Sequence, residues 1–294
     1  MKLARFTQGG NTRIGKVEGD RVVDLSGLPG VGTSMRALIR DLETLRPALE
    51  AATAPSYALA EVVLQAPVND PQKFLAIGMN YRKHAEEARQ AGIPVPDSQF
   101  WFTKQVSCVN GPTGDVVKPS FSNQMDYEIE LGMVIGRACR NVTREEAPSV
   151  IAGYMIVNDV SVRDWQKPSF TIGKSFDTSG PTGPWLTTAD EVADPLALEM
   201  VGTVNGEERQ RSMTGDMIYD IYDQIVHLTR VMTLMPGDII ATGTPSGIGA
   251  AQGKFLKSGD VMRMEITGLG QIENRVIADA GAEAPSSCDA TVPA

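Results

Sequence analysis

The chain has 294 residues, and its 27 lysines and arginines against 36 aspartates and glutamates give a formal charge of −9. This acidic balance argues against nucleic acids and anionic membrane surfaces as partners, because proteins bind both through basic residues. A chain of this size buries about 75% of its unfolded surface, so it forms a core without cross-links. The composition, 42% hydrophobic and 21% charged residues, is typical of a globular protein with one large domain or a large and a small one.

The sequence also favours a cytoplasmic location. No stretch approaches the ~20 apolar residues that a membrane span needs. The first ten residues are interrupted by Arg5 and two glycines, so they lack the apolar centre of a signal peptide. Cys108, Cys139 and Cys288 are widely spaced without a Cys-x-x-Cys, which fits a reducing compartment and neither a disulfide framework nor a zinc site.

Residues 1–70 are predicted to form a small α+β domain. Short strands are expected over 2–6, 13–17 and 21–24, followed by helical structure over 34–52. The Val-Asn-Asp-Pro segment at 68–71 provides turn chemistry before a new apolar run, and we place the domain boundary there. The second domain is expected over 71–281. Residues 282–294 are small and polar and contain proline, so we expect a disordered tail.

The second domain is predicted to be strand-rich. Strands are expected over 127–135, 153–162, 198–204 and 238–242. Asn205-Gly206 directly follows one of them and is a hairpin signal. Strands outnumber helices and no regular βαβ alternation appears, so the predicted fold class is α+β.

Two helices are expected in this domain. The first covers 81–90, with Asn80 as its N-cap and Gly92 just beyond its end. The second covers 216–234, because apolar residues recur there at intervals of three and four. These residues are Ile218, Ile221, Ile225, Leu228 and Met232.

Two glutamates share one face of a predicted strand. The two-residue period of the 127–135 strand puts Glu128 and Glu130 side by side, with Ile129 on the other face. Like charges at this distance repel, so each is pushed toward protonation unless a cation lies between them. The alternative is a strand edge that faces solvent.

A third carboxylate strengthens the case for a metal site. The 153–162 segment is an apolar strand that would otherwise be interior, yet Asn158 and Asp159 stand near its end. Buried carboxylates need partners. Three carboxylates, with the remaining positions left to water or substrate, suit Mg²⁺ or Mn²⁺, which prefer oxygen ligands. Asp164 is an alternative fourth ligand, but we expect it to pair with Arg163 or to cap the turn.

The two histidines are expected to play different parts. His84 and Glu87 share a face of the first helix, and a histidine held by a carboxylate can act as a general base toward water. The alternative is a surface helix held by i,i+4 ion pairs, Arg82 with Glu86 and Lys83 with Glu87. His227 lies beside the apolar stripe of the second helix and is expected to be a core or interface residue.

Two glycine-rich loops are candidates for holding an anion. Lys174, in the segment 171–177, precedes the Gly/Pro-rich stretch 179–185, and the loop at 242–249 contains Thr244. Neither matches the glycine patterns that bind phosphates. Such loops usually serve only as turns, but their backbone amides and the Thr244 hydroxyl can hold a carboxylate.

Five motifs together resemble the fumarylacetoacetate hydrolase family. They are Asn80-Tyr81-x-x-His84-x-x-Glu87, Asp126-Tyr127-Glu128-x-Glu130-Leu131, Asn158-Asp159-x-Ser161-x-Arg163-Asp164-x-Gln166, Gly173-Lys174-Ser175-Phe176-Asp177 and Pro236-Gly237-Asp238-x-Ile240-x-Thr242-Gly243-Thr244-Pro245-x-Gly247. Each is weak alone, but they occur in the family's order over residues 74 to about 275. The N-terminal segment resembles the first domain of the longer bacterial members. The resemblance implies a mixed β-sandwich roll for the catalytic domain and a homodimer.

The resemblance also implies a role for each motif residue. By motif match, the ligands of one Mg²⁺ or Mn²⁺ are Glu128, Glu130 and Asp159. The water-activating dyad is His84 with Glu87, and the family's lysine is Lys174. The substrate-holding positions are Arg163, Gln166 and Thr244.

The implied roles fit hydrolysis of a C–C bond in a 2,4-diketo acid, such as fumarylpyruvate, acetylpyruvate or a diketo-deoxy sugar acid. The carboxylate and 2-oxo oxygen of the acid would bind the cation. Water deprotonated by His84 would add to the 4-oxo carbon, and Lys174 would stabilise the oxyanion. The products would be pyruvate, or a related 2-oxo acid, and a carboxylic acid.

Two alternatives stay open on the sequence. An isomerase, a hydratase or an oxaloacetate decarboxylase would use the same metal-enolate site. A non-catalytic scaffold that binds a keto acid would need the metal and the anion-holding residues but no base. The presence of His84 with Glu87 therefore counts against the scaffold.

Overall fold

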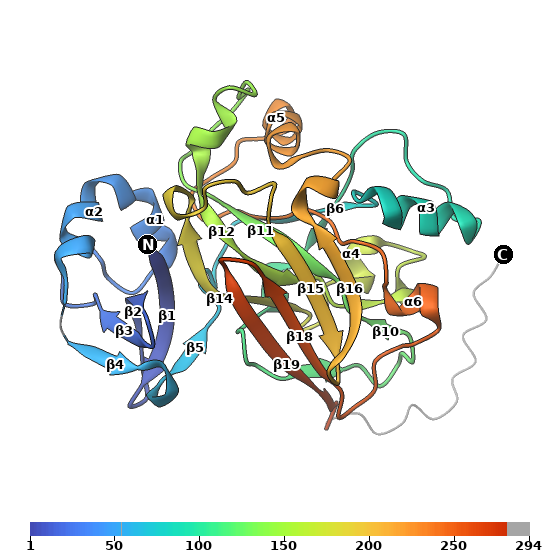
Figure 1. Cartoon of the computed structure of the whole chain (residues 1–294), viewed down its shortest axis with the longest axis horizontal. Helices are drawn as coiled ribbons and strands as arrows, with labels where there is room; N and C mark the ends of the chain where they lie inside the picture. The colour runs from blue at the N-terminus through green and yellow to red at the C-terminus, as the bar shows by residue number, and fades with distance from the viewer. Residues whose placement is uncertain (54, 281–294) are drawn as a thin grey trace.

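The N-terminal segment forms a strand-rich unit beside the rest of the molecule (Figure 1, left). The computed structural model describes residues 1–53 and 55–280. The elements of this unit are β1 (Lys2–Gln8), β2 (Asn11–Glu18), β3 (Arg21–Asp24), α1 (Met35–Arg40), α2 (Leu42–Ala51), β4 (Ser56–Ala58) and β5 (Val63–Gln65). All three strands predicted here are present, the first two being longer than expected.

The helical stretch predicted over 34–52 is two helices. Ser34 caps α1, since its hydroxyl accepts a hydrogen bond from Ala37 N at 3.3 Å. Asp41 (φ −102°, ψ 13°) lies outside the helical region and separates α1 from α2. The change of direction lets Leu38 of α1 and Leu49 of α2 both reach the core, where each is 0% exposed.

The larger sheet joins the N-terminal unit to the rest of the chain. Its further strands are β6 (Phe74–Gly78), β7 (Phe100–Lys104), β8 (Val109–Asn110), β11 (Ile129–Ile135), β12 (Ile151–Asn158), β14 (Gly180–Thr188) and β17 (Ile239–Ala241). The main path of this 12-stranded sheet runs β4-β3-β2-β1-β14-β12-β11-β17-β6-β7. Pairing of Lys2 with Thr187 and of Leu3 with Leu186 connects β1 to β14. One sheet therefore crosses the predicted boundary at residue 70.

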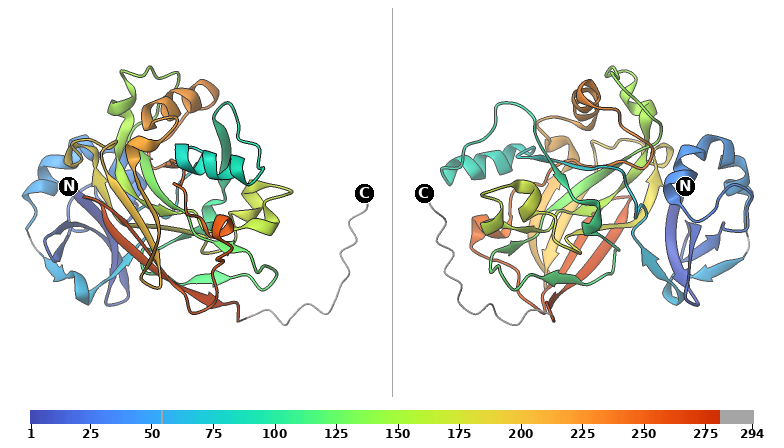
Figure 2. Two further views of the ribbon diagram at one scale, coloured as in Figure 1. Left: turned by 45° about the vertical axis from the view of Figure 1, so that its right-hand side comes forward. Right: turned by 180° about the vertical axis from the view of Figure 1, so that it is seen from behind.

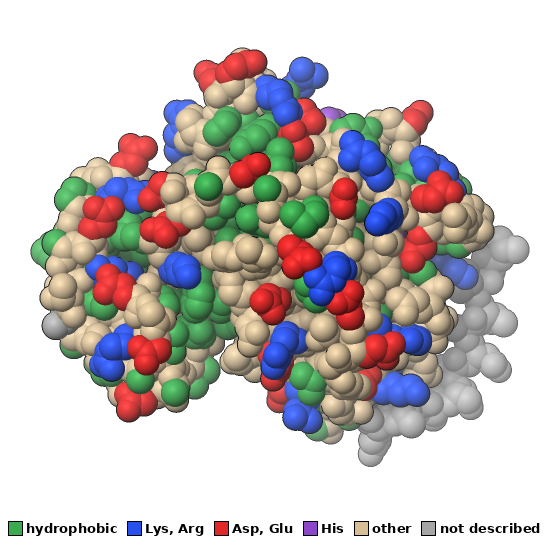
Figure 3. All heavy atoms as spheres, in the orientation of Figure 1, with side chains coloured by type: hydrophobic (Ala, Val, Ile, Leu, Met, Phe, Trp, Pro, Cys, Tyr) green, Lys and Arg blue, Asp and Glu red, His purple; other side chains and the backbone are tan. Residues whose placement is uncertain are grey.

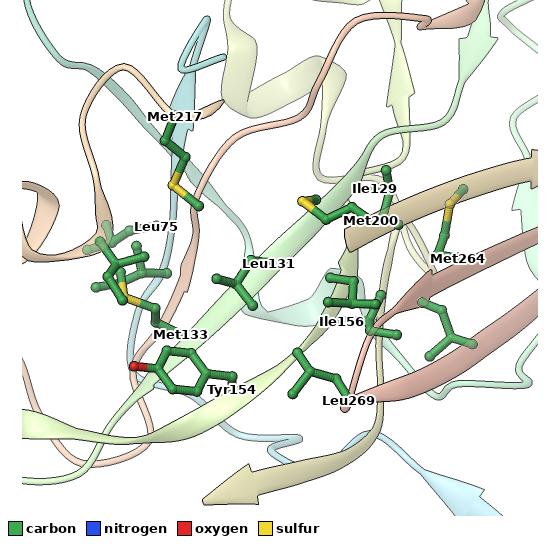
Figure 4. Packing of buried hydrophobic residues seen from close by; sticks show 14 of the residues in the cluster. Leu75, Ile129, Leu131, Met133, Tyr154, Ile156, Met200, Met217, Met264 and Leu269 are labelled. Atoms are coloured by element: carbon green, nitrogen blue, oxygen red, sulfur yellow. The ribbon is translucent and has the colours of Figure 1, made fainter. Parts of the chain in front are cut away.

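A second sheet packs against the larger one. Its strands are β9 (Val116–Lys118), β15 (Glu199–Val204), β16 (Glu207–Met213), β18 (Val261–Ile266) and β19 (Gly270–Ala278), in the order β16-β15-β18-β19-β9. Leu131 and Ile156 of the larger sheet lie near Met200 and Met264 of the smaller one in a buried cluster (Figure 4). The predicted hairpin joins β15 to β16, and Asn205 (φ 51°) and the next glycine both have the positive φ that its tight turn requires.

Short elements complete the structure. The helices are α3 (Arg82–Gln90), α4 (Phe170–Gly173), α5 (Ile221–Val231) and α6 (Gly249–Gln252), and β10 (Met125–Asp126) pairs with β13 (Ser161–Val162). The 3₁₀ turns are η1 (Leu59–Glu61), η2 (Val106–Cys108), η3 (Ala147–Val150), η4 (Arg163–Trp165), η5 (Ala189–Glu191) and η6 (Thr214–Asp216). Helices α3, α4 and α6 lie at the end of the molecule away from the N-terminal unit (Figures 1 and 2).

The described surface carries mixed charge. Acidic and basic side chains are interspersed over the face shown in Figure 3. Across residues 1–53 and 55–280, no helix has the length and apolar character to cross a membrane. Cys108 and Cys139 are free, buried thiols, whereas Cys288 and the predicted tail at 282–294 lie outside the described residues.

Two helix predictions need correction at their ends. Asn80 does not cap α3; its side-chain amide donates to the carbonyls of Thr242 and Tyr219 at 2.8 and 3.0 Å, and Tyr81 occupies the N-cap position. The helix predicted over 216–234 covers only Ile221–Val231. Asp220 caps it, because its carboxylate accepts from the backbone amides of the two residues after Ile221. The apolar period alone did not reveal this start.

Candidate active site

Two strand predictions are interrupted where the site forms. The predicted strand 127–135 is broken before Ile129, because Glu128 N and Ile129 N donate to the side chains of Asn158 and Gln210, both at 3.0 Å. The predicted strand 153–162 is broken after Asn158, where Asp159 N donates to Glu128 O at 2.9 Å. The two side-chain bonds replace ladder bonds, and together with the backbone bond they fix Glu128 and Asp159 at the ends of adjacent strands.

The three predicted metal ligands lie together. One oxygen from each of Glu128, Glu130 and Asp159 lies within 4.8 Å of the other two. The three residues are only 5%, 1% and 0% exposed. The alternative of a solvent-facing strand edge is therefore wrong, since every residue of β11 is buried.

Glu128 is held by two basic side chains. Lys174 Nζ lies 2.6 Å from Glu128 Oε2, and Arg163 Nη2 lies 2.6 Å from Oε1. Burial raises the pKa of Glu128, but the charges of Lys174 and Arg163 outweigh burial and hold this pKa below its ordinary value. Glu128 is thus an ionised ligand candidate at neutral pH.

Glu130 has a different environment. Its Oε2 accepts a hydrogen bond from Gly243 N at 2.8 Å, and within the described chain it forms no ion pair with a lysine or arginine. Burial and then the charges of Asp159 and Glu128 hold the pKa of Glu130 well above its ordinary value. A buried carboxylate of this kind needs a proton or a further cation, so the oxygen donors present fit a hard divalent metal ion.

Asp159 is covered by two lysines. Lys174 Nζ lies 2.6 Å from Asp159 Oδ2, and Lys104 Nζ lies 2.8 Å from Oδ1. Lys104 has a side chain that is 0% exposed and also donates to Ser179 O at 3.1 Å. The sequence analysis missed Lys104. Its signal was a lysine two residues after Phe102 on the inward face of an apolar strand, β7.

The predicted dyad is formed on α3. His84 Nδ1 lies 3.1 Å from Glu87 Oε2, and Glu87 Oε1 accepts from Gly247 N at 3.2 Å. Because a carboxylate only accepts hydrogen bonds, Nδ1 carries a hydrogen, and in the neutral form of the ring the lone pair is on Nε2. The alternative pattern of i,i+4 pairs is not formed: Arg82 donates to the carbonyls of Asp216 and Met217 instead.

The three predicted substrate-holding residues differ in the hydrogen-bonding groups that they leave available to a substrate. Arg163 is engaged by Asp126 and Glu128, through contacts of 2.8 and 2.6 Å. Gln166 Nε2 is buried and has no hydrogen-bond partner among the described residues, so it is a free donor. The Thr244 hydroxyl donates to Ile129 O at 3.0 Å, so toward a substrate it can only accept. Gln210, another residue that the sequence analysis missed, donates to Thr244 Oγ1 at 2.8 Å.

Two other predictions can be placed. Asp164 neither joins the carboxylates nor pairs with Arg163; its Oδ1 accepts from Ser122 Oγ at 2.6 Å. His227 is half-buried and stacks on Trp101, with ring centroids 6.5 Å apart, which agrees with the expected core or interface position.

One cavity of about 560 Å³ connects these groups. Every predicted site residue except Asp159 lines it: His84, Glu87, Glu128, Glu130, Arg163, Gln166, Lys174 and Thr244. Asp159 lies behind the cavity wall, covered by Lys104 and Lys174. The arrangement puts a histidine base, a buried acidic triad and hydrogen-bond donors around one small-molecule site.

Comparison with known proteins places most of the chain in known families. Residues 73–277 match the fumarylacetoacetate (FAA) hydrolase C-terminal family, and residues 1–67 match the Rv2993c-like N-terminal family. The chain is 40% identical over 286 residues to a 2,4-didehydro-3-deoxy-L-rhamnonate hydrolase of Sphingomonas sp. (strain SKA58), covering 94% of this chain and 96% of that protein.

Two solved structures extend the comparison. The maleylpyruvate hydrolase of Sphingobium sp. SYK-6, in complex with manganese(II) and pyruvate, is 39% identical with a TM-score of 0.82, over 95% of this chain and 99% of that chain. A fumarylacetoacetate hydrolase of psychrophilic Exiguobacterium antarcticum is 36% identical with a TM-score of 0.82, over 95% and 100%. The predicted strand-rich α+β fold and the family resemblance are confirmed: the chain belongs to the fumarylacetoacetate hydrolase family.

Proposed function

We propose that this chain is a divalent-metal-dependent hydrolase that cleaves a C–C bond of a 2,4-diketo acid. The products are pyruvate, or a related 2-oxo acid, and a carboxylic acid. The observation that carries the proposal is the His84–Glu87 pair, with its 3.1 Å contact, in the same cavity as Glu128 and Glu130 of the buried acidic triad. The relatives named as hydrolases of a diketo-deoxy sugar acid and of maleylpyruvate support it.

Glu128, Glu130 and Asp159 are the proposed ligands of one Mg²⁺ or Mn²⁺. Supporting observations are the close approach of their oxygens and the raised pKa of Glu130, which burial and then neighbouring carboxylates cause. When bound, the ion supplies Lewis-acid polarisation of the 2-oxo group and charge for the developing enolate.

His84 is the proposed general base. Its Nε2 lone pair takes a proton from water, while Glu87 holds the ring through Nδ1 and balances its new charge. The water oxygen adds to the 4-oxo carbon, and the Lys174 ammonium stabilises the oxyanion. The C3–C4 bond then breaks, its electron pair passes to the pyruvate enolate, and C3 takes up a proton. Arg163, Gln166 and Thr244 are the proposed residues that hold the substrate, with the Thr244 hydroxyl acting only as a hydrogen-bond acceptor.

The direct test is a substrate panel with Mg²⁺ or Mn²⁺ present. Acetylpyruvate, fumarylpyruvate, a diketo-deoxy sugar acid and oxaloacetate are incubated with the enzyme, and the products are identified by NMR. We expect pyruvate and a carboxylic acid from at least one diketo acid, and loss of this activity in His84→Ala. His227→Ala is the matched control, because this histidine lies outside the cavity lining. If oxaloacetate is the only acid converted and it releases CO₂, the result would support a decarboxylase. If no acid gives a product, the result would support a scaffold.

Three further properties belong to the proposal. We propose a cytoplasmic homodimer, with a small keto acid as its partner and neither nucleic acid nor membrane. The free thiols of Cys108 and Cys139 support the reducing compartment. We also propose domains at 1–70 and 71–281, which the family matches at 1–67 and 73–277 support. Sedimentation equilibrium of the full chain tests the dimer, and a monomer mass would exclude it.

A further inference from the structure

One end of the cavity is lined by charged side chains, and the other end is lined mainly by apolar ones. The charged lining residues all belong to the proposed catalytic end, and within residues 1–53 and 55–280 the only cationic side chains of the lining, apart from the histidine, are Arg163 and Lys174. The rest of the lining is dominated by apolar side chains, which include Ile93, Pro94, Phe100, Phe102, Phe170 and Ile248.

Three phenylalanine rings form one wall that starts at the catalytic end. The Phe102 ring centroid lies 5.1 Å from Lys174 Nζ. Phe170 packs edge-on against Phe100 with centroids 5.1 Å apart, and its centroid lies 5.8 Å from that of Phe102. Phe100 and Phe102 share one face of β7, and Phe170 comes from α4. We call Phe100, Phe102 and Phe170 the aromatic wall.

A glycine opposite β7 makes room for this wall. A Cβ atom on Gly78 would lie 3.0 Å from Phe100 Cδ1, which is closer than ordinary van der Waals contact. Phe100 and Phe170 are only half-buried, so each ring keeps a face for a ligand. The site therefore combines a charged end with an apolar surface of fixed shape.

Among the described residues that line the cavity, no cationic side chain lies beyond the charged end to pair with a second charge on the substrate. The two cations at the charged end are already paired, Arg163 with Asp126 and Glu128, and Lys174 with Glu128 and Asp159. A carboxylate placed against the aromatic wall would lose its water without gaining a cation, which is costly. An alkyl or aryl group would instead gain from leaving water there.

Resting on the proposed function, we propose that the substrate is an acylpyruvate whose acyl group is apolar, either alkyl or aryl, and carries no carboxylate. The pyruvyl part lies at the charged end, and the acyl chain lies along the aromatic wall. The cavity of about 560 Å³ is in the range of sites that bind drug-sized ligands, so it has room for an acyl group well beyond acetyl.

A matched pair of substrates tests this inference. The anion of 2,4-dioxoheptanoic acid ends in a methyl group, and 2,4-dioxoheptanedioate ends in a carboxylate at the same chain length. We expect kcat/KM to favour the first by at least about 100-fold in the metal-loaded enzyme. Equal rates, or a faster dicarboxylate, would overturn the apolar substrate class and leave the hydrolase function intact.

Binding to His84→Ala separates the two claims. This variant should bind both acids without cleaving them, so isothermal titration reports the preference independently of turnover. If the wild type cleaves neither acid while the variant still prefers the monocarboxylate, the hydrolase function fails and the apolar site stands. If the variant shows no preference, the aromatic wall does not select the substrate.

Variants of the aromatic wall complete the test. Phe170→Lys should cut the preference at least tenfold by giving the distal carboxylate a cation, and Phe170→Ala should lower kcat/KM for the monocarboxylate alone. Phe121→Ala is the control, because this ring is 51% exposed and lies outside the cavity lining. An unchanged ratio in Phe170→Lys, with the fold intact by circular dichroism, would contradict the inference.

Discussion

The two ends of the cavity differ in whether their buried side chains need partners of opposite charge. At the aromatic wall, burial needs no partner, because rings gain by leaving water. At the charged end and directly behind its wall, four buried carboxylates stand against three basic side chains; these are Asp126, Glu128, Glu130 and Asp159, with Lys104, Arg163 and Lys174. The excess negative charge falls on Glu130, which forms no ion pair within the described chain.

Mutations at the two ends of the cavity should therefore change different properties of the protein. Stability and metal affinity belong to the charged end, because removing or adding one charge there leaves another buried and unpaired. Substrate choice belongs to the aromatic wall. A mutation at one end that changed the property assigned to the other end would contradict this division.

The largest effect is expected for Glu128→Gln. Glu128 contacts Lys174 and Arg163 and is one of three proposed ligands, so its loss should lower Mn²⁺ affinity and turnover together, each by more than about 100-fold. Calorimetric Mn²⁺ titration and steady-state kinetics measure the two. Full activity in this variant would exclude the metal assignment.

Lys104→Met should be the most destabilising single change. It removes one of two cations from Asp159, whose side chain is 0% exposed, and should cost about 3–5 kcal/mol of unfolding free energy. Urea unfolding at pH 7 gives the value. Lys254→Met is the control, since its pair with Glu207 is exposed to solvent and should contribute little. Equal losses of unfolding free energy in the two variants would show that the buried Lys104–Asp159 pair is no more important to stability than an exposed pair.

Glu130→Gln should have opposite effects with and without metal. Burial and then its carboxylate neighbours raise the pKa of Glu130, so the unfolded chain releases this proton at a lower pH than the folded protein. The metal-free fold therefore loses stability as pH rises from the ordinary glutamate pKa to the raised one.

The glutamine variant lacks this loss. In EDTA its melting temperature should exceed that of the wild type at pH 8 by more than at pH 4, whereas Mn²⁺ should raise it less than in the wild type. Melting curves at the two pH values measure both differences. A lower melting temperature than the wild type in EDTA at pH 8 would contradict the raised pKa.

The smallest effect is expected where the two ends meet. Phe102→Leu keeps an apolar side chain but removes the ring that faces the Lys174 ammonium at 5.1 Å. The loss of about 1 kcal/mol should raise KM about fivefold with little change in kcat. Trp101→Phe alters the opposite face of the same strand and should leave KM unchanged. A large fall in kcat in Phe102→Leu would mean that the ring acts on catalysis directly.

Local patterns in the sequence were sufficient for much of the site. The two-residue alternation that predicted Glu128 and Glu130 side by side agrees with the close approach of their oxygens. The three-residue spacing of His84 and Glu87 predicted a contact that the structure contains. Their catalytic and metal-binding roles stay predictions until the variants are measured.

Features that depend on distant contacts escaped the sequence analysis. Lys104 was missed because its partner, Asp159, is far away in sequence, and a lysine in a strand usually points to solvent. Asn80 looked like a helix cap, but Thr242 and Tyr219 compete for its side chain from another part of the chain. In each case long-range hydrogen bonds or ion pairs overrode the local preference.

Pairing of β1 with β14 means that the N-terminal unit covers one edge of β14. An open strand edge with apolar neighbours is a template for aggregation. Leu3 and Leu186 pair across this junction, and both are 0% exposed in a cluster that also contains Leu38 of α1 and Met155 of β12. A fragment that starts at residue 71 would expose this strand edge and about half of that cluster, so we expect it to aggregate more readily than the full chain.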